Sequence, residues 1–382
     1  MKKDWSWADK KSRKELVAMA KVILVINPGS TSTKIAVFQD KEKMFEETIR
    51  HNPEELKDFD WCMEQVDYRK HLILSTLAEK GVVLSELSAI CSRGGMIPPC
   101  ESGAYRVDQQ MVDYMYSVKK GAHVSNIGCV IAYQIANTVG IPAYIYDPVT
   151  VDELVPIARI TGLPEIQRGV IGHTLNTRAI AMKCAKEKLG KEFDESTIIV
   201  AHIGGGISVR LLQNGRNIDA CNDDNGGMSP ERSGGLPALQ LIKLCFSGKY
   251  TETELIKKIR GNGGLKALLG TSDALVIEKR IEQGDQKAKL IYEAMAYSIA
   301  KDIGQLAVVV GGKVDAIALT GGIAYSKLIT SSIAEKVSFI APVYLMPGEH
   351  EMEAMAAGTL RVERGEEAVK SFSGIVQNTV AS

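Results

Sequence analysis

The chain has 382 residues, of which 45% are hydrophobic, and its 46 basic and 46 acidic side chains cancel. This length suggests two domains, each large enough to bury its own core. The balanced charge provides no basic field, so neither nucleic acid nor an anionic membrane is expected as a partner.

Seven cysteines are scattered along the chain without CxxC spacing. An odd number of cysteines in such a pattern argues against a disulfide framework and against a zinc site. A reducing, cytoplasmic compartment fits this composition best.

Residues 1–21 are polar and basic, and we interpret them as an N-terminal extension. The apolar run that follows at 22–26 is far too short for the core of a signal peptide or for a membrane span. It is better explained as a strand, with which the organised part of the chain begins.

The first expected element covers residues 21–40, where two β-rich runs flank a Pro-Gly-Ser turn. This pattern predicts a strand, a turn and a second strand. Apolar spacing near 3.6 residues then predicts helices at 69–80, at 174–189, which His173 would begin, and at 287–310.

The strand–turn–strand pattern recurs from residue 197, where an apolar run leads into Gly-Gly-Gly and a second apolar run follows. An Asn-Gly pair at 214–215 predicts a further hairpin turn. From residue 314, a third apolar run ends in Gly-Gly before a helical stretch.

Strands that alternate with helices predict an α/β architecture. The repeat at 22 and 197 predicts two related halves, 22–150 and 151–382, with a boundary near Asp147-Pro148. The last helix could return from the second half to the first. Two glycine turns that face each other would form a phosphate-binding cleft between the domains.

The sequence lacks the common nucleotide-binding patterns. It contains no GxxxxGK[ST], and no GxGxxG follows a strand, so neither a P-loop nor a dinucleotide-binding domain is expected. HExxH and GxSxG are absent as well. Phosphate binding therefore falls to the hairpin turns.

The first of these turns, NPGSTSTK at 27–34, combines small residues, hydroxyl groups and a cation. Gly29 would let backbone N–H groups approach an anion closely. The other candidates for nucleotide binding in this turn are Asn27, Ser30, Ser32 and Lys34. An ordinary polar hairpin turn is the alternative explanation.

The second turn, HIGGG at 202–206, places three glycines at the end of a strand. Consecutive glycines cost backbone entropy, and they usually mark the close approach of the backbone to another group. We interpret this second turn as a phosphate contact, with a tight turn alone as the alternative. The third turn, TGGI at 320–323, would suit a contact with adenosine. The candidate residues of these two turns are His202, Gly204, Gly205, Gly206, Gly321 and Gly322.

Together, the three turns resemble the phosphate-1, phosphate-2 and adenosine motifs of the acetate and sugar kinase/Hsp70/actin superfamily. NPGSTSTK is similar to N-x-G-S-[ST]-S-x-K, AHIGGG to a CHLG-type turn, and LTGGIAYS to FTGGIGEN. From about residue 22 to 365, the chain is identified as a member of the acetokinase family, and it is most similar to the butyrate kinase branch. The resemblance implies a two-domain ribonuclease H-like (actin-like ATPase) fold with duplicated mixed-sheet domains, helices and an interdomain cleft.

The resemblance also implies an active site. Five short motifs of this chain, CSRGG, GAHVSN, YIYDP, GHTLN and ERSGG, are similar to catalytic motifs of the family. The catalytic candidates that they contain are Arg93, His123, Asp147, His173 and Arg232. Glu351 best matches a metal-associated glutamate, with Glu349 as the alternative. The family further implies ATP or ADP with Mg²⁺, and a homodimer or a higher homo-oligomer.

This residue set suits the transfer of a phosphoryl group to a carboxylate. A carboxylate is already ionised at pH 7, so it needs no strong base. It must instead be held close to a triphosphate of like charge, which two arginines and the histidines can do. Asp147 would then orient the nucleophile or an arginine, and Mg²⁺ would bridge the β- and γ-phosphates.

Three positions bear on the choice of acid. Where acetate kinases have a leucine and a phenylalanine that resemble the walls of a methyl pocket, this chain has Ala122 and Gly172. A loop near Pro230 is also shortened. The smaller side chains should admit the additional methylenes of butyrate, each worth about 0.8 kcal/mol when buried.

Three alternatives stay open at this point. The acid could be isobutyrate or another short-chain fatty acid. A non-catalytic nucleotide switch like actin or Hsp70 would share the three turns without needing the arginines. A sugar kinase would use Asp147 as a general base, but two arginines suit a carboxylate better.

Overall fold

The computed structural model describes residues 20–118 and 124–375, so most of the N-terminal extension lies outside the described residues. Contacts between residues divide the chain into two compact units. Unit 1 contains residues 20–98, 103–148 (without 119–123) and 352–375, and unit 2 contains 99–102 and 149–351. The residues from 352 onward thus belong with the first half of the chain. The predicted interdomain cleft stays a prediction, and each unit is described by itself.

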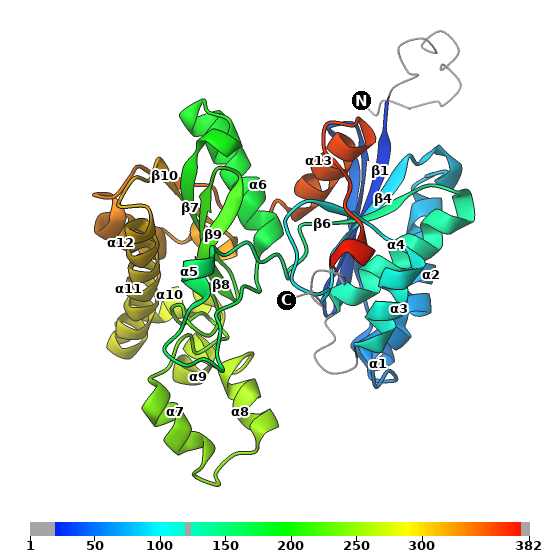
Figure 1. Cartoon of the computed structure of the whole chain (residues 1–382). Helices are drawn as coiled ribbons and strands as arrows, with labels where there is room; N and C mark the ends of the chain where they lie inside the picture. The colour runs from blue at the N-terminus through cyan, green and yellow to red at the C-terminus, as the bar shows by residue number, and fades with distance from the viewer. Residues whose placement is uncertain (1–19, 119–123, 376–382) are drawn as a thin grey trace. The chain divides into compact units, whose positions relative to one another are not determined.

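Unit 1 is a sheet with helices on its two faces (Figure 1). Its strands are β1 (Val22–Pro28), β2 (Ser32–Gln39), β3 (Glu42–Arg50), β4 (Ala89–Arg93), β5 (Ala104–Arg106) and β6 (Ala143–Tyr146). Its helices are α1 (Pro53–Leu56), α2 (Val66–Glu79), α3 (Gln109–Ser117), α4 (Ser125–Val139) and α13 (Glu351–Glu363), which starts at the last residue of unit 2.

Unit 2 repeats this plan and adds helices. Its strands are β7 (Thr197–Ile203), β8 (Ile207–Gln213), β9 (Arg216–Cys221), β10 (Ala316–Thr320) and β11 (Val343–Leu345). Its helices are α5 (Pro156–Arg159), α6 (Thr174–Cys184), α7 (Ala238–Cys245), α8 (Glu252–Ile259), α9 (Gly264–Leu269), α10 (Ala274–Glu282), α11 (Gln286–Val309) and α12 (Lys327–Val337).

The two sheets confirm the predicted duplication. The strand order is β3-β2-β1-β4-β6-β5 in unit 1 and, read in the same sense, β9-β8-β7-β10-β11 in unit 2. In both, an antiparallel meander of three strands continues into two parallel strands. Even the register shift recurs at the matching place, between Val37 and Phe38 in β2 and between Leu211 and Leu212 in β8.

In unit 1, helices α2, α3 and α4 lie on one side of the sheet and α13 lies on the other (Figure 1). Alternating side chains of β6 make the contact with α13, because successive residues of a strand point to opposite faces. The hydroxyl of Tyr144 donates to Glu363, and that of Tyr146 donates to Glu367. The C-terminal segment is therefore tied to the same sheet as the N-terminal strand.

In unit 2, alternate side chains of β7 pack into two different hydrophobic cores on the two faces of the sheet. Ile199 and Ala201 pack in a cluster with α11 and α12, whereas Ile198 and Val200 pack against α6. His202 continues the series that faces α6, and so does Thr320 on the neighbouring β10. The alternation of side chains along the two strands therefore places two polar side chains on the face that carries α6.

The parallel strands bring their carboxyl ends to one edge in each sheet. In unit 1, Ile26 pairs with Ser92 and Arg93 pairs with Tyr146, so the ends of β1, β4 and β6 lie together. Such edges are where open α/β sheets bind their ligands. None of the helices in the described ranges is long and apolar enough to cross a membrane.

Candidate functional site

The β1–β2 turn follows the carboxyl end of β1 and contains the first group of predicted residues. It closes with a hydrogen bond of 2.7 Å from the Gly29 amide to the carbonyl oxygen of Ser32. Ser30 is exposed, and Asn27 and Ser32 are half-buried. The ammonium of Lys34 lies 3.6 Å from a carboxylate oxygen of Glu46 on β3, so this cation has an acidic neighbour within its own sheet.

The turn rests on a buried arginine that the motif analysis did not identify. Arg69 of α2 is fully buried, and its Nη1 donates to the carbonyl oxygens of Gly29, at 2.8 Å, and Ser32, at 3.2 Å. Its Nη2 donates to the carbonyl oxygen of Ser30 at 3.1 Å. One signal was present in the sequence, since Arg69 occupies an apolar-face position of its helix.

Arg93 ends β4 and precedes two glycines, of which Gly94 packs against Pro148 and Gly95 against α4. A Cβ on Gly95 would lie 2.3 Å from Oδ1 of Asn126, and this oxygen accepts a hydrogen bond from the Met96 amide. The segment after Arg93 is thus held at the start of α4. Within the described ranges, Nδ2 of the fully buried Asn126 has no hydrogen-bond partner. The predicted His123 and Ala122 lie outside the described residues, just before this helix.

Asp147 follows β6 with an unusual backbone. It is 3% exposed and has a φ of 42°, in the left-handed region that non-glycine residues seldom adopt. Its Oδ1 accepts a hydrogen bond of 2.7 Å from the Gly103 amide. Strained backbone of this kind persists where the surrounding structure holds it, and it is common at functional sites.

In unit 2, two predicted histidines meet face to face. The rings of His173, the N-cap of α6, and His202 of β7 stack with centroids 4.0 Å apart and an interplanar angle of 15°. Nδ1 of His173 lies 3.0 Å from the hydroxyl oxygen of Ser208 on β8. Strand parity and the start of the helix together explain this encounter.

Asn176, one turn into α6, fixes the orientation of His202. Its Oδ1 accepts from the backbone amide of His350, so its Nδ2 is the atom 2.8 Å from Nδ1 of His202. Because Nδ1 must then accept, the neutral His202 ring carries its proton on Nε2. That nitrogen faces the glycine turn, where a Cβ on Gly204 would lie 3.0 Å away from it.

The glycine turn makes room for the second predicted arginine. A Cβ on Gly206 would lie 2.5 Å from Cζ of Arg232, whereas one on Gly205 would have its nearest neighbour at 3.6 Å. Gly206 therefore permits a close approach, and the approaching group is this guanidinium, whereas Gly205 has no such neighbour. Asp223, which sequence reasoning missed, binds Nη1 of Arg232 and also lies 3.5 Å from Nε of Arg260.

The third turn adjoins the second. The amides and carbonyls of Gly321 and Gly348 form two mutual hydrogen bonds of 3.1 Å. Gly321 has a φ of 90°, and a Cβ there would lie 2.4 Å from the carbonyl oxygen of Ile203 at the end of β7. Gly322 opens a short 3₁₀ helix, Gly322–Tyr325. The structure thus brings the predicted adenosine turn against the glycine-rich turn.

The predicted metal-associated residue, Glu351, is 5% exposed at the first position of α13. The described part of the chain contains no group of three or more His, Cys, Asp or Glu side chains arranged for a metal. A single carboxylate fits Mg²⁺, which keeps several waters and is held partly by nucleotide phosphates.

The structure modifies the argument about the acyl pocket. A Cβ on Gly172 would lie 2.7 Å from the hydroxyl oxygen of Ser208 and 3.1 Å from Nη2 of the buried Arg210. The glycine therefore does not open space in the direction of its missing side chain, because two side chains of β8 fill it. Pro230 is buried, and its carbonyl oxygen accepts from the Lys266 amide.

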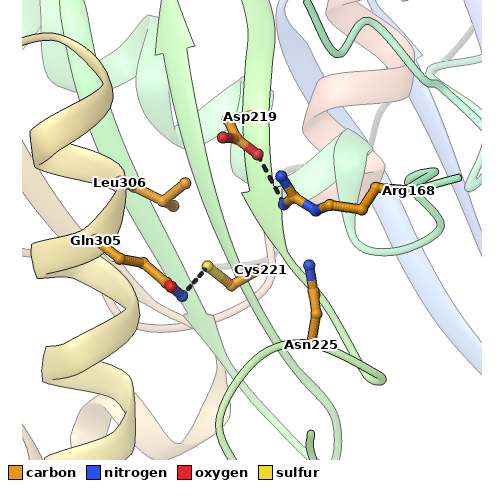
Figure 2. A pocket seen from close by; sticks show the side chains of 6 residues that line it. All are labelled: Arg168, Asp219, Cys221, Asn225, Gln305 and Leu306. Atoms are coloured by element: carbon orange, nitrogen blue, oxygen red, sulfur yellow. Dashed lines mark hydrogen bonds and ion pairs between the residues drawn. The ribbon is translucent and has the colours of Figure 1, made fainter. Parts of the chain in front are cut away.

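A cavity of about 280 Å³ lies elsewhere in unit 2, beside β9 and α11, and no predicted site residue lines it (Figure 2). Its lining residues are Arg168, Asp219, Cys221, Asn225, Gln305 and Leu306. Arg168 is already engaged with Asp219 and with the carbonyl oxygen of Ala220. Burial raises the pKa of the Cys221 thiol, which disfavours a reactive thiolate.

Comparisons with known proteins give a consistent picture. The model of the acetokinase family matches residues 173–344. A relative named butyrate kinase 2, from Clostridium acetobutylicum, is 49% identical over 352 residues, which cover 92% of this chain and 99% of the relative.

Two solved structures share the fold. A Porphyromonas gingivalis acetate kinase matches with a TM-score of 0.75 and 19% identity, over 90% of this chain and all of the other. A Francisella tularensis propionate kinase matches with a TM-score of 0.71 and 16% identity, over 88% and 98%. The predicted α/β fold with two duplicated mixed sheets is confirmed.

Proposed function

The chain belongs to the acetokinase family, and we propose that it is a butyrate kinase that converts ATP and butanoate reversibly to ADP and butanoyl phosphate. The observation that carries the choice of acid is the 49% identity, over nearly the whole of both chains, with a protein named butyrate kinase 2. A carboxylate oxygen of butanoate attacks the γ-phosphorus, a C–O–P linkage forms, and the bond from that phosphorus to the β–γ bridging oxygen breaks. ADP leaves with the electron pair.

In unit 1, the β1–β2 turn binds phosphate oxygens and Arg93 binds anionic oxygens at the end of β4. A cation fixed at this position opposes the repulsion between the carboxylate and the triphosphate, and it stabilises the equatorial oxygens of the transition state. The strained, buried Asp147 has the role of an orienting group, because the nucleophile is already ionised and needs no base.

In unit 2, Arg232 and the histidine pair act on the transferring phosphoryl group. Asp223 holds the guanidinium of Arg232 beside the glycine turn, so little reorganisation is needed when charge develops. The Nε2 proton of His202 faces the same turn and is available to a phosphate oxygen. His173 stacks on that ring, and His123 is proposed to bind substrate as the family resemblance implies.

Mg²⁺ is proposed as the metal, with Glu351 as the residue that holds it through water and Glu349 as the alternative. When bound, the ion neutralises charge on the β- and γ-phosphates. The turn that contains Gly321 and Gly322 is proposed to contact adenosine. The hydroxyl of the neighbouring Thr320 donates to the Gly348 carbonyl and so ties this turn to Gly348.

The proposed preference for butyrate rests on the similarity to butyrate kinase 2 more than on the residues of the predicted acyl pocket. Ala122 lies outside the described residues, and the space beside Gly172 is filled by Ser208 and Arg210. Isobutyrate and other short-chain acids are therefore the alternatives that the test must include.

A homodimer and a cytoplasmic location are further parts of the proposal. The first follows from the family resemblance alone. The second is supported by the seven cysteines, which are all free thiols in the structure.

A steady-state comparison of acetate, propionate, butyrate and isobutyrate tests the proposal, with hydroxylamine trapping the acyl phosphate. We expect the highest kcat/KM for butyrate, and acetate should be lower by about 10-fold or more, since each methylene discriminates by roughly 1–3 kcal/mol. A preference for acetate contradicts the choice of acid. Turnover with none of the four acids contradicts the proposed reaction.

A further inference from the structure

The guanidinium of Arg69 is surrounded by neutral oxygens. Besides the three turn carbonyls, it donates to the hydroxyl of Thr33 at 3.2 Å, and both Nε and Nη2 donate to Oε1 of Gln65. Burial lowers the pKa of Arg69 to about 10, so the group is still a cation at pH 7. A fully buried cation is costly unless its donors are satisfied, and here each N–H direction has an oxygen to meet.

The direction of the three carbonyls determines the direction of the amides. In a trans peptide the C=O of one residue and the N–H of the next point opposite ways. The carbonyls of Gly29 and Ser30 point at Arg69, so the N–H groups of Ser30 and Thr31 point away from it. Both residues are exposed, and within the described ranges neither amide donates a hydrogen bond.

Two successive outward amides with a cation behind them are an arrangement that suits an anion. Backbone N–H groups that converge in a turn bind phosphate oxygens, and a buried positive charge adds to the local potential. No helix begins at this turn, since β2 follows it directly. Arg69 therefore takes the place that a helix N-terminus has in other phosphate sites.

We propose that Arg69 is a positioning residue for phosphate binding, which sets the β1–β2 turn so that the Ser30 and Thr31 amides face the nucleotide phosphates. This inference rests on the proposed function, because it assumes that this turn binds ATP. It adds a residue on α2, 36 positions from Thr33 along the chain, to the machinery for the nucleotide.

The geometry requires arginine in particular. A lysine keeps the charge but has one nitrogen, which cannot reach three carbonyls that Arg69 meets with two nitrogens. Arg69→Lys therefore separates the geometry of the turn from the charge behind it. Arg69→Met removes both.

Binding of two partial ligands provides the test, with the full chain and in the absence of any acid. Tripolyphosphate probes the phosphate site, and adenosine probes the turn at Gly321. For Arg69→Lys we expect the Kd of tripolyphosphate and of ATP to rise about 10–100-fold, the loss typical of misplaced hydrogen bonds to a charged group. The Kd of adenosine should stay within about 2-fold, since a role in folding alone would change both.

Leu77→Ala is the matched control, because Leu77 lies two turns further along α2 and is buried like Arg69, at 1% exposed. It should lower the melting temperature at least as much as Arg69→Lys while it leaves the affinity for tripolyphosphate unchanged. The inference is overturned if the Arg69→Lys variant binds tripolyphosphate with the Kd of the wild type. It is also overturned if the Kd of adenosine rises as much as that of tripolyphosphate. Failure of the proposed reaction is recognised separately, as wild-type protein that makes no acyl phosphate.

Discussion

The β1–β2 turn of unit 1 and the β7–β8 turn of unit 2 occupy the same place in two sheets of the same topology, yet their backbones are held differently. In unit 1 a buried side chain, Arg69, holds the carbonyls from below. In unit 2 the position of Gly206 cannot hold a side chain, because the guanidinium of Arg232 occupies the space where its Cβ would lie. The β1–β2 turn is thus held by a buried arginine behind it, whereas the β7–β8 turn depends on a glycine that leaves room for an arginine beside it.

This difference shows how a duplicated fold can diverge while its strands stay the same. Both sheets retain even the register shift toward the end of the second strand. The sheet fixes where a turn lies, and one or two side chains on neighbouring elements determine what the turn presents to a ligand.

The largest effect is expected from Arg232→Ala, which removes the guanidinium beside the glycine turn. Its kcat should fall by about 10³–10⁵-fold with the fold intact, since a cation on the transferring phosphoryl group is worth that much in related chemistry. Arg260→Ala is the control, because Arg260 shares Asp223 with it but is 51% exposed. Steady-state kinetics and circular dichroism make the comparison. Near-normal turnover of the Arg232 variant would remove this residue from the site.

A smaller effect is expected from alanine at single glycines of the two turns. Gly206→Ala should lower kcat by about 100-fold, because its Cβ displaces Arg232 and a misplacement of about 1 Å can cost that much. Gly205→Ala and Gly29→Ala should lose less than about 5-fold, as their new Cβ atoms have no neighbour closer than 3.6 and 3.4 Å. Equal losses in the three variants would contradict the distinction between the turns.

Acid should weaken unit 1 through His51, whose Nε2 lies 2.8 Å from the hydroxyl of Thr33 next to the turn. Burial, with Arg69 as a second cause, lowers the pKa of His51 to about 4. The unfolded chain therefore binds the proton first, and stability falls as the pH drops from about 6.5 to about 4. The loss should approach about 2–3 kcal/mol. Urea unfolding of wild type and His51→Gln at pH 7 and 4.5 measures it, and an equal loss in both would exclude His51.

Unit 2 contains a group with the opposite dependence. Burial raises the pKa of Asp302 on α11 to about 6, so its charged form is disfavoured in the folded state and stability falls as the pH rises from about 4 to about 6. Asp302→Asn should therefore be more stable than wild type at pH 7.5 by about 1–2 kcal/mol, with little difference at pH 4. Chemical denaturation at the two pH values decides it, and a variant that is less stable at pH 7.5 would contradict this account.

Much of the fold could be predicted from the sequence because its signals are local. The two strand–turn–strand segments, the helix that starts after His173 and the helix near 287–310 follow from runs, periods and glycines, and the structure confirms them. The meeting of His173 and His202 also follows, since strand parity turns His202 toward α6.

The residues that were missed depend on contacts between distant segments. Arg69 meets the turn only because α2 packs behind it, and Asp223 meets Arg232 only because the loop after β9 folds back. The interpretation of Gly172 was incomplete for the same reason. A small residue leaves space only if no other strand fills it, and Ser208 and Arg210 come from a strand more than 30 residues away.

The most direct test of the central claim follows the oxygen of the acid. Purified protein is incubated with MgATP and butanoate labelled with ¹⁸O in its carboxylate, and the products are observed by ³¹P nuclear magnetic resonance. Direct phosphoryl transfer predicts ADP together with an acyl phosphate whose phosphorus signal is shifted by one bound ¹⁸O, and neither signal with Arg232→Ala. The formation of AMP and pyrophosphate, or hydrolysis of ATP without a labelled acyl phosphate, would contradict the account.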